Sequence, residues 1–332
     1  MADYKTLHGS NIEVVASDPS NPVVGQVWYN TTSNVIKGFT SNPTGSWAAG
    51  GNMNTNRKDH AGAGIQTSAI AIAGQAPGGA TVNAESYNGS AWTEGANLNT
   101  ARNLLGGTGA TNTAALGFGG SPHTGATESW NGTAWTEVAD LNTARYGPGP
   151  AGTNTAALAF GGNVPPNAAT DVVESWNGTS WAETADLNTA KEQVGGTGTN
   201  TAALSVGGFL GASPQPAAIV ATVESWNGTS WTEVGDLNTA RYQQGGAGTT
   251  TAALVFGGNP PASGLAVTEK WNGTSWTEVA DLSTARIKLN RGGGGTQPAA
   301  LAFGGDTGST QVVTEEWSEP TTATVTFDAS DV

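Results

Sequence analysis

Short stretches in which large apolar residues alternate with small or polar ones recur along the whole chain. In residues 156–160, Ala156, Leu158 and Phe160 fall on one side of an extended strand, and the alanines between them fall on the other. A period of two is the pattern of a β-strand, and no segment shows the period of a helix. The pattern therefore predicts an all-β protein.

Three sequence tracts return in a fixed order, which indicates an internal repeat. The first is Leu-Asn-Thr-Ala-Arg or a variant of it, and its six copies end at positions 57, 102, 145, 191, 241 and 286. The second is Thr-Ala-Ala-Leu-x-Phe-Gly-Gly, clearest at 113–120, 155–162 and 251–258. The third is Glu-Ser-Trp-Asn-Gly-Thr-Ser-Trp, clearest at 174–181 and 224–231, and its first aromatic residue recurs after 43, 46, 50, 45 and 46 residues.

Each repeat is consistent with four short strands: a glycine-rich strand after the Arg, the Ala-Leu-Phe strand, and a hairpin formed by the third tract. Its Asn-Gly pair is a hairpin-turn signal, because both residues tolerate positive φ. Four strands in about 45 residues, repeated around a closed ring, are typical of a β-propeller. An open β-solenoid is the alternative, but solenoid coils are usually shorter and lack a hairpin in every repeat.

The chain ends must supply the strand that completes the ring. A seventh hairpin-like segment lies at Val27–Trp47, and the last third strand, Val312–Trp317, needs a partner. Ser46–Ala49 and Thr322–Phe327 are the two candidates. We predict a six-bladed propeller with four strands per blade, closed by N- and C-terminal strands. Seven blades, one of them incomplete, are the alternative.

The order of these features resembles the kelch repeat. An Arg, a small-residue strand, an apolar strand ending in Gly-Gly and then two aromatic residues follow one another from Met53 to Trp317. The sequence departs from the kelch pattern in the shorter gap between the aromatics and in the alanines that replace bulkier residues. The resemblance implies a kelch-like β-propeller.

The N-terminal segment resembles a different group of proteins. Residues 25–39, Gly-Gln-Val-Trp-Tyr-Asn-Thr-Thr-Ser-Asn-Val-Ile-Lys-Gly-Phe, are similar to a strand-turn-strand segment of bacteriophage tail-fibre and virion proteins, those of marine phages in particular. This resemblance implies a location in the virion. Residues 1–22 would form an arm that docks onto other virion proteins, with Asp18–Pro22 as a stiff linker, and residues 23–332 would form the propeller.

Composition and charge exclude several classes of function. There are 12 Lys and Arg against 26 Asp and Glu, and the net charge of −14 argues against binding to nucleic acid. The chain has no Cys, which excludes disulfides, thiol catalysis and thiolate metal sites. No apolar run has the length of a membrane span, and Met1–Lys5 does not open a secretory signal, so we expect no membrane insertion.

The basic residues that end the first tract would form a ring if the propeller closes. Such a ring could bind an anion, but the favoured interpretation is pairing with backbone carbonyls or with a local carboxylate such as Asp140, Asp186, Asp236 or Asp281. A residue present in every blade more often solves a problem of blade packing. These residues are Arg57, Arg102, Arg145, Lys191, Arg241 and Arg286.

Aromatic residues, carboxylates and histidines give no catalytic or metal site. The second Trp of each hairpin could stack on a sugar, but packing across the hairpin and between blades is favoured. This set is Trp135, Trp181, Trp231 and Trp276. A glutamate lies two residues after the second Trp of each hairpin and is expected to point outward. These residues are Glu94, Glu137, Glu183, Glu233 and Glu278. His8, His60 and His123 recur at no repeat position and are expected to be solvated or capping residues, so no metal site is predicted.

The loops that differ between repeats lie at one end of the predicted ring. Because successive strands run in opposite directions, the loops between second and third strands share one end with the connections between blades. Variation confined to one face is typical of recognition surfaces in repeat proteins, and prolines lower the ordering cost of binding. The candidate ligand-binding residues are Pro77, His123, Pro165, Pro166, Phe209, Leu210, Pro214, Pro260 and Pro261, with Phe209 and Leu210 as exposed anchors.

No nucleophile, base and orienting residue can be assigned together. Galactose oxidase-like propellers need a Cys that is absent, and Ser175–Trp181 differs from the sialidase turn by an Asn in place of Asp. We therefore predict a non-enzymatic virion protein without cofactor, whose loops contact a host-surface glycan or protein. A capsid decoration protein is the alternative, followed by a carbohydrate-active enzyme.

Overall fold

The computed structural model describes residues 12–42, 44–211, 218–260, 264–289, 294–319 and 321–327. These residues form strands, turns and loops, and none of them lies in a helix. This part of the chain accordingly contains no helix that is long and apolar enough to cross a membrane. The chain divides into two compact units, one of Met1–Ser46 with Glu319–Val332 and the other of Trp47–Ser318.

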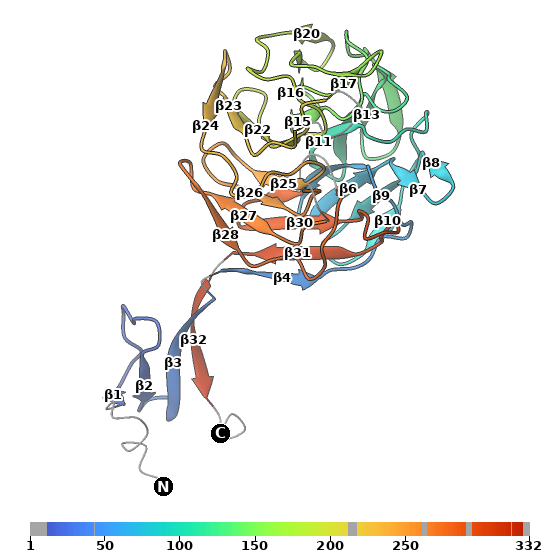
Figure 1. Cartoon of the computed structure of the whole chain (residues 1–332). Coiled ribbons are helices and arrows are strands. Elements are labelled where there is room, and N and C mark those ends of the chain that lie inside the picture. Colours follow the sequence, from blue (N-terminus) through green and yellow to red (C-terminus); the bar gives the residue numbers. More distant parts are fainter. Residues whose placement is uncertain are drawn as a thin grey trace. The chain divides into compact units, whose positions relative to one another are not determined.

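The larger unit is built from six four-stranded antiparallel sheets (Figure 1). Sheet 1 contains β5 (Ala61–Ile65), β6 (Ser68–Ile72), β9 (Ala84–Tyr87) and β10 (Trp92–Glu94). Sheet 2 contains β11 (Gly106–Thr111), β12 (Ala114–Phe118), β13 (Thr127–Trp130) and β14 (Trp135–Val138). Sheet 3 contains β15 (Gly149–Gly152), β16 (Ala157–Phe160), β19 (Val173–Trp176) and β20 (Trp181–Glu183).

The remaining sheets repeat the same plan. Sheet 4 contains β21 (Gly195–Gly198), β22 (Ala203–Val206), β23 (Val223–Trp226) and β24 (Trp231–Val234). Sheet 5 contains β25 (Gly245–Gly248), β26 (Ala253–Phe256), β27 (Thr268–Trp271) and β28 (Trp276–Val279). Sheet 6 contains β29 (Gly295–Thr296), β30 (Ala299–Phe303), β31 (Thr314–Ser318) and β4 (Ser46–Ala49).

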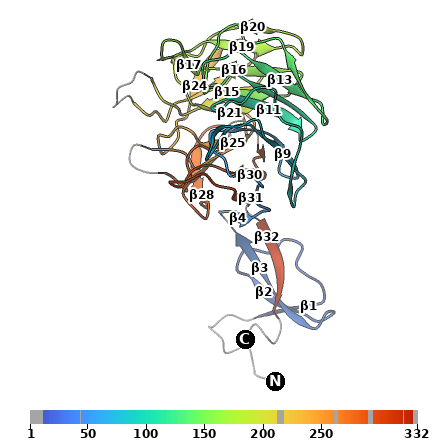
Figure 2. The same cartoon turned by 90° about the vertical axis from the view of Figure 1, so that its right-hand side faces the viewer.

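The first strands of the sheets meet around a common centre. Each contacts the next in the cyclic order β5, β11, β15, β21, β25, β29 and back to β5. Figures 1 and 2 show β11, β15 and β25 in the middle of this unit, and Figure 1 shows β20, β24 and β28 at its rim. The predicted all-β propeller architecture is confirmed.

The ring is completed by the N-terminal strand β4, which is the fourth strand of sheet 6. The Trp47 ring lies 5.5 Å from Trp317 of the same sheet and 5.0 Å from Phe256 of sheet 5. Of the two candidate closing strands, Ser46–Ala49 is therefore the correct one. Thr322–Phe327 lies in β32 (Thr321–Phe327) and pairs with β3 (Val35–Asn42) instead.

The smaller unit is a separate four-stranded sheet in the order β1 (Glu13–Val15), β2 (Val27–Asn30), β3 and β32. The strands β2 and β3 of the extra N-terminal segment thus belong to this sheet and not to a seventh sheet of the ring, whereas the end of that segment lies in β4 of sheet 6. The division predicted at residue 22 is also wrong, because the unit boundary falls after Ser46 and the C-terminal strand joins the N-terminal segment. The proposed stiff linker is bound to this sheet through Asp18.

The core of the larger unit lies between neighbouring sheets. The second strand of sheet 3, Ala157–Phe160, is buried along its whole length, so both of its faces are covered. Leu158 and Phe160 pack with Trp226 and Trp231 of sheet 4. On the other face, Ala157 and Ala159 pack with Leu116 and Phe118 of sheet 2. The alternation of large and small residues in the sequence reflects these two interfaces.

Candidate binding face

Each repeated basic residue forms an ion pair with a glutamate on the third strand of its own sheet. The Lys191–Glu224 and Arg102–Glu128 distances are both 3.1 Å, and Arg286 lies 2.7 Å from Glu315. The remaining pairs are Arg57–Glu85, Arg145–Glu174 and Arg241–Glu269. All of these side chains are at most 2% exposed. Because the cations are buried against carboxylates, they do not form an anion-binding ring.

The predicted aspartate partners have a different role. Asp140, Asp186 and Asp281 accept hydrogen bonds from backbone N–H groups at the start of third strands, at 3.1, 3.2 and 3.2 Å. The expectation of backbone carbonyl partners was correct, since Arg145 donates to the carbonyl oxygens of Gly161 and Val172. Burial lowers the pKa of Arg145, and the facing carboxylate of Glu174 opposes that shift.

The rest of the first tract surrounds the same glutamate. The backbone N–H and the side-chain amide of Asn142 donate to Glu174 Oε2 at 2.7 and 2.8 Å. The Asn142 amide also donates to the Trp181 carbonyl at 3.1 Å. The tract connects the outer strand of one sheet to the inner strand of the next, so these contacts fix each connection to the following sheet.

The paired aromatic residues pack inside the ring. Trp176 and Trp181 face each other across their hairpin at 5.4 Å, and Trp181 also meets Phe118 of the preceding sheet at 5.0 Å. The four tryptophans considered for sugar stacking are 5–6% exposed, so they lack an open ring face; they are Trp135, Trp181, Trp231 and Trp276.

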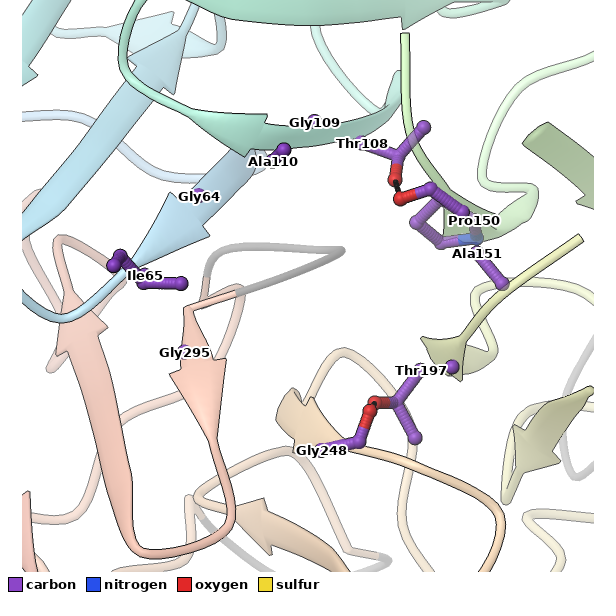
Figure 3. A pocket seen from close by; sticks show the side chains of 12 residues that line it. Gly64, Ile65, Thr108, Gly109, Ala110, Pro150, Ala151, Thr197, Gly248 and Gly295 are labelled. Atoms are coloured by element: carbon purple, nitrogen blue, oxygen red, sulfur yellow. Dashed lines mark hydrogen bonds between the residues drawn. The ribbon is translucent and has the colours of Figure 1, made fainter. Parts of the chain in front are cut away.

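The centre of the ring contains a cavity of about 160 Å³ at the end where first and second strands are joined (Figure 3). Its lining comes from the first strands and includes Thr108, Pro150 and Thr197, with a glycine from each of the six sheets. Thr108 bonds to the Gly152 carbonyl, and Thr197 bonds to the Gly248 carbonyl at 2.6 Å, so the hydroxyls link neighbouring strands. None of the described side chains that line the cavity is acidic, basic or a histidine.

At the opposite end of the ring, a belt of six residues lies around its centre, with one residue before each first strand. All have positive φ between 51° and 64°; they are Asp59, Leu104, Gly147, Gln193, Gln243 and Lys288. N–H groups in the belt donate to the carbonyl of the equivalent residue one sheet earlier, for example Leu104 to Asp59 at 2.8 Å and Asp59 to Lys288 at 3.1 Å. The Leu289 N–H, which bonds to the Gln243 carbonyl at 3.3 Å, completes the circle.

Five of the six belt residues are not glycine, although the left-handed conformation costs other residues about 1–2 kcal/mol. Gly147 shows that a side chain is not required for the belt backbone. The Gln243 amide donates to Gln193 Oε1 at 2.6 Å, and Gln243 Oε1 is buried without a hydrogen-bond partner among the described residues. Strained backbone positions of this kind often occur at functional sites.

A second circle of variable residues surrounds the belt. The residue after each repeated Arg or Lys forms a β-bridge with the third residue beyond the end of the second strand. The six bridges are Lys58↔Gln75, Asn103↔Ser121, Tyr146↔Asn163, Glu192↔Phe209, Tyr242↔Asn259 and Ile287↔Asp306. We call the belt and these bridged residues the channel mouth. It lies at the predicted variable-loop end.

One side of the channel mouth, between sheets 6 and 1, is charged. Lys58 Nζ lies 2.6 Å from Asp306 Oδ2, and Lys288 Nζ lies 3.7 Å from Asp59 Oδ2. Burial raises the pKa of Asp306, but the bond from Lys58, the Gly308 N–H and the charge of Lys288 together hold that pKa below its usual value. This side therefore carries two cations matched by two carboxylates.

The other side of the channel mouth, over sheets 2 to 5, is aromatic. The rings of Tyr146 and His123 pack against each other at a tilt, with 4.8 Å between their centroids. His123 Nε2 lies 2.9 Å from Asn163 Oδ1. Two repeats further along the chain, the ring of Tyr242 packs against the ring of Phe209, with 5.6 Å between their centroids. In both pairs a loop residue of one sheet supports a tyrosine of the next sheet.

The predicted loop residues differ in how far they are exposed to solvent. Pro77, Pro165 and Pro166 are exposed, whereas His123, Leu210 and Pro260 are partly buried. The expectation that Phe209 is an exposed anchor is wrong: it is 8% exposed because it packs under Tyr242. Pro214 and Pro261 lie outside the described residues. Two short hairpins, β7 (Gln75–Ala76) with β8 (Gly79–Ala80) and β17 (Asn163–Val164) with β18 (Ala168–Ala169), shape the loops of sheets 1 and 3.

Two sets of residues were missed by sequence reasoning. The first is the buried glutamate set, whose signal was a Glu two residues before the first aromatic in all six repeats. The second is the channel mouth, whose signal was that the two residues after the repeated Arg or Lys differ in each repeat. His60 was also misjudged, since it is fully buried and its ring lies 5.2 Å from Phe303.

No protein-family model and no curated protein matches the chain. Many solved structures resemble its fold. One of them is YjhT, which superimposes with a TM-score of 0.66 at 12% sequence identity, over 83% of this chain and 100% of YjhT. At this identity the likeness concerns the fold alone. The chain thus shares with YjhT an all-β fold of the β-propeller type.

Proposed function

We propose that the protein is a non-enzymatic recognition module that binds its ligand at the channel mouth. The observation that carries this proposal is that the positions at which the repeats differ gather there. The repeated Arg, Glu and Trp side chains are buried and hold the sheets together. Residues that depart from the repeat are therefore those available to specify a ligand.

The chemistry of the channel mouth supports binding. Its aromatic side combines Tyr146 and Tyr242 with the amides of Gln193 and Gln243, which suits polar ligands with flat or apolar patches. A host-surface glycan or a protein loop has this character. The kelch-like repeats and the tail-fibre-like segment at residues 25–39 support a place in a virus particle, with the N-terminal segment attached to other virion proteins.

Binding of labelled full-length protein to a printed array of bacterial surface polysaccharides and to intact bacterial cells tests the proposal. The test variant combines Tyr146→Ala and Tyr242→Ala. The control combines Thr179→Ala and Thr229→Ala, which lie exposed in Asn-Gly turns at the opposite end of the ring. We expect the control to bind as the wild type does and the test variant to lose about tenfold in affinity, equivalent to ~1.4 kcal/mol.

Three other results would contradict parts of the proposal. Unchanged binding by a correctly folded tyrosine variant would exclude the channel mouth as the site. Absence of binding by the wild type to the array and to cells would count against recognition and favour capsid decoration. Shortening of any polysaccharide by the wild type would overturn the non-enzymatic assignment.

A further inference from the structure

One face of the small unit is covered by its own chain. The Asp18 carboxylate accepts hydrogen bonds from Trp28 Nε1 at 3.1 Å, from Asn30 Nδ2 at 2.7 Å and from Lys37 Nζ at 2.7 Å. Trp28 and Lys37 are register partners on β2 and β3, so both project from this face. Within the described part of the small unit, Trp28 is the one large apolar side chain that is fully buried.

The opposite face carries a row of apolar side chains across all four strands. Val14 pairs with Tyr29, Tyr29 pairs with Ile36, and Ile36 pairs with Phe327. Register partners share a face, and Val27 joins them because it lies two residues before Tyr29. We call Val14, Val27, Tyr29, Ile36 and Phe327 the apolar face. It contains no charged side chain.

The apolar face is open to solvent. Val14 is 66% exposed, Phe327 is 42% exposed and Val27 is 37% exposed. The Phe327 ring lies against Gly38, where an added Cβ would come within 2.8 Å of it. Of the six exposed large hydrophobic residues in the described chain, five lie in this unit, and the larger unit contributes Ile65 alone.

Within the described part of this unit, Trp28 is the one large apolar side chain that is fully buried, so its core is small. Small domains are marginal in stability, and a disulfide, a metal or an oligomeric partner often adds to it. The chain has no Cys, and the described residues contain no group of three or more His, Cys, Asp and Glu placed to hold a metal. An oligomeric partner would add to the stability of this unit.

The edge of the sheet points to the same conclusion. β32 is the last strand in the sheet order, and its sequence, Thr-Thr-Ala-Thr-Val-Thr-Phe, has neither a charge nor a proline. Monomeric proteins usually protect such edges with Lys, Pro or a bulge. An uncharged edge seven residues long is suited to pairing with another strand.

We propose that the apolar face is covered by the same face of further copies of this chain, so that the protein is a homo-oligomer joined through its small unit. An uncharged apolar surface is complementary to itself. Two copies each carry a net charge of −14, so they repel except where charge is absent. Such an assembly would carry one channel mouth per copy.

Sedimentation velocity of the full-length protein tests the oligomer. Val14→Glu places a charge on the apolar face, and Ser33→Glu adds the same charge at the exposed turn between β2 and β3. Because Val14 is exposed, its substitution should not prevent folding of a single chain. We expect an oligomer for the wild type and for Ser33→Glu, and a monomer for Val14→Glu. A monomeric wild type, or a Val14→Glu protein as oligomeric as the wild type, would overturn the proposal.

Cross-linking locates the contact independently of stability. The chain has no Cys, so a Val14→Cys protein carries a single reactive thiol. We expect a short bis-maleimide to link two Val14→Cys chains and to leave Ser33→Cys chains unlinked. An oligomer in which Val14→Cys chains do not cross-link would place the interface elsewhere and refute the role of the apolar face. Loss of ligand binding in the tyrosine variant is a separate outcome and leaves this result unaffected.

Discussion

Replacement of Gly196 by Ala should destabilise the ring, whereas the same change at Gly246 should not. Both glycines are the second residue of a first strand, and neither has positive φ. At Gly196 an added Cβ would lie 2.2 Å from the Pro150 carbonyl oxygen and 2.9 Å from the Phe160 ring. At Gly246 the nearest atom would be the Gly196 carbonyl oxygen at 3.5 Å, an ordinary contact.

These distances set the sign and size of each effect. The contact at Gly196 is with backbone of the neighbouring sheet, so two inner strands must separate to admit a methyl group. Overpacking of this kind costs about 1–3 kcal/mol. Gly246→Ala restricts the unfolded chain without strain in the folded state, which stabilises by about 0.4–1 kcal/mol. The two variants should therefore differ by roughly 1.4–4 kcal/mol.

Thermal unfolding followed by circular dichroism measures the difference. One kcal/mol corresponds to about 2–4 °C in Tm for a domain of some 150–250 residues. We expect Gly196→Ala to unfold several degrees below the wild type and Gly246→Ala to unfold at or slightly above it. Equal Tm values for the two variants would show that close approach of the inner strands does not dictate the glycine at 196.

Two further predictions concern ion pairs. Arg145→Met leaves Glu174 as an unpaired buried charge and should lower the free energy of unfolding by about 3–5 kcal/mol, whereas Arg145→Lys should cost less because Lys191 holds this position in sheet 4; urea unfolding would rank the two, and equal losses would contradict the pairing argument. In the small unit, bonds from Lys37, Asn30 and Trp28 lower the pKa of Asp18 from 3.8 to about 2. Its contribution to stability is therefore present above pH 3.8 and lost as the pH falls toward 2. The NMR signal of the Trp28 indole N–H should titrate in that range and lose this titration in Asp18→Asn.

The repeat was sufficient to predict the all-β propeller fold, because strand period and turn chemistry are local properties. The Asn-Gly turns and the alternating Ala-Leu-Phe strands each specify their own structure. The choice between the two candidate closing strands depends on contacts between residues that are distant in the sequence. Ser46–Ala49 and Thr322–Phe327 both have strand-like sequences, and the contacts of Trp47 with Trp317 and Phe256 distinguish them only in three dimensions.

The candidate site was predicted less well, for physical reasons that differ by residue. Glu174 has the sequence pattern of a polar strand residue, and its burial depends on Arg145 arriving from the preceding connection. Phe209 lies in a variable loop and was assigned to the surface, yet its β-bridge to Glu192 brings it under Tyr242. The belt conformation at Gln193 and Gln243 leaves no sequence signal, because neither residue type is associated with positive φ.

The way the ring closes has a consequence for biosynthesis. Trp47 is synthesised long before its neighbouring strand in sheet 6, β31, which ends at Ser318. A chain that stops before β31 lacks the partner of β4, so Trp47 and the flank of sheet 5 at Phe256 remain uncovered. Apolar surface of that kind is what chaperones and proteases act on. Closure of sheet 6 therefore distinguishes chains that contain β31 from chains that stop before it.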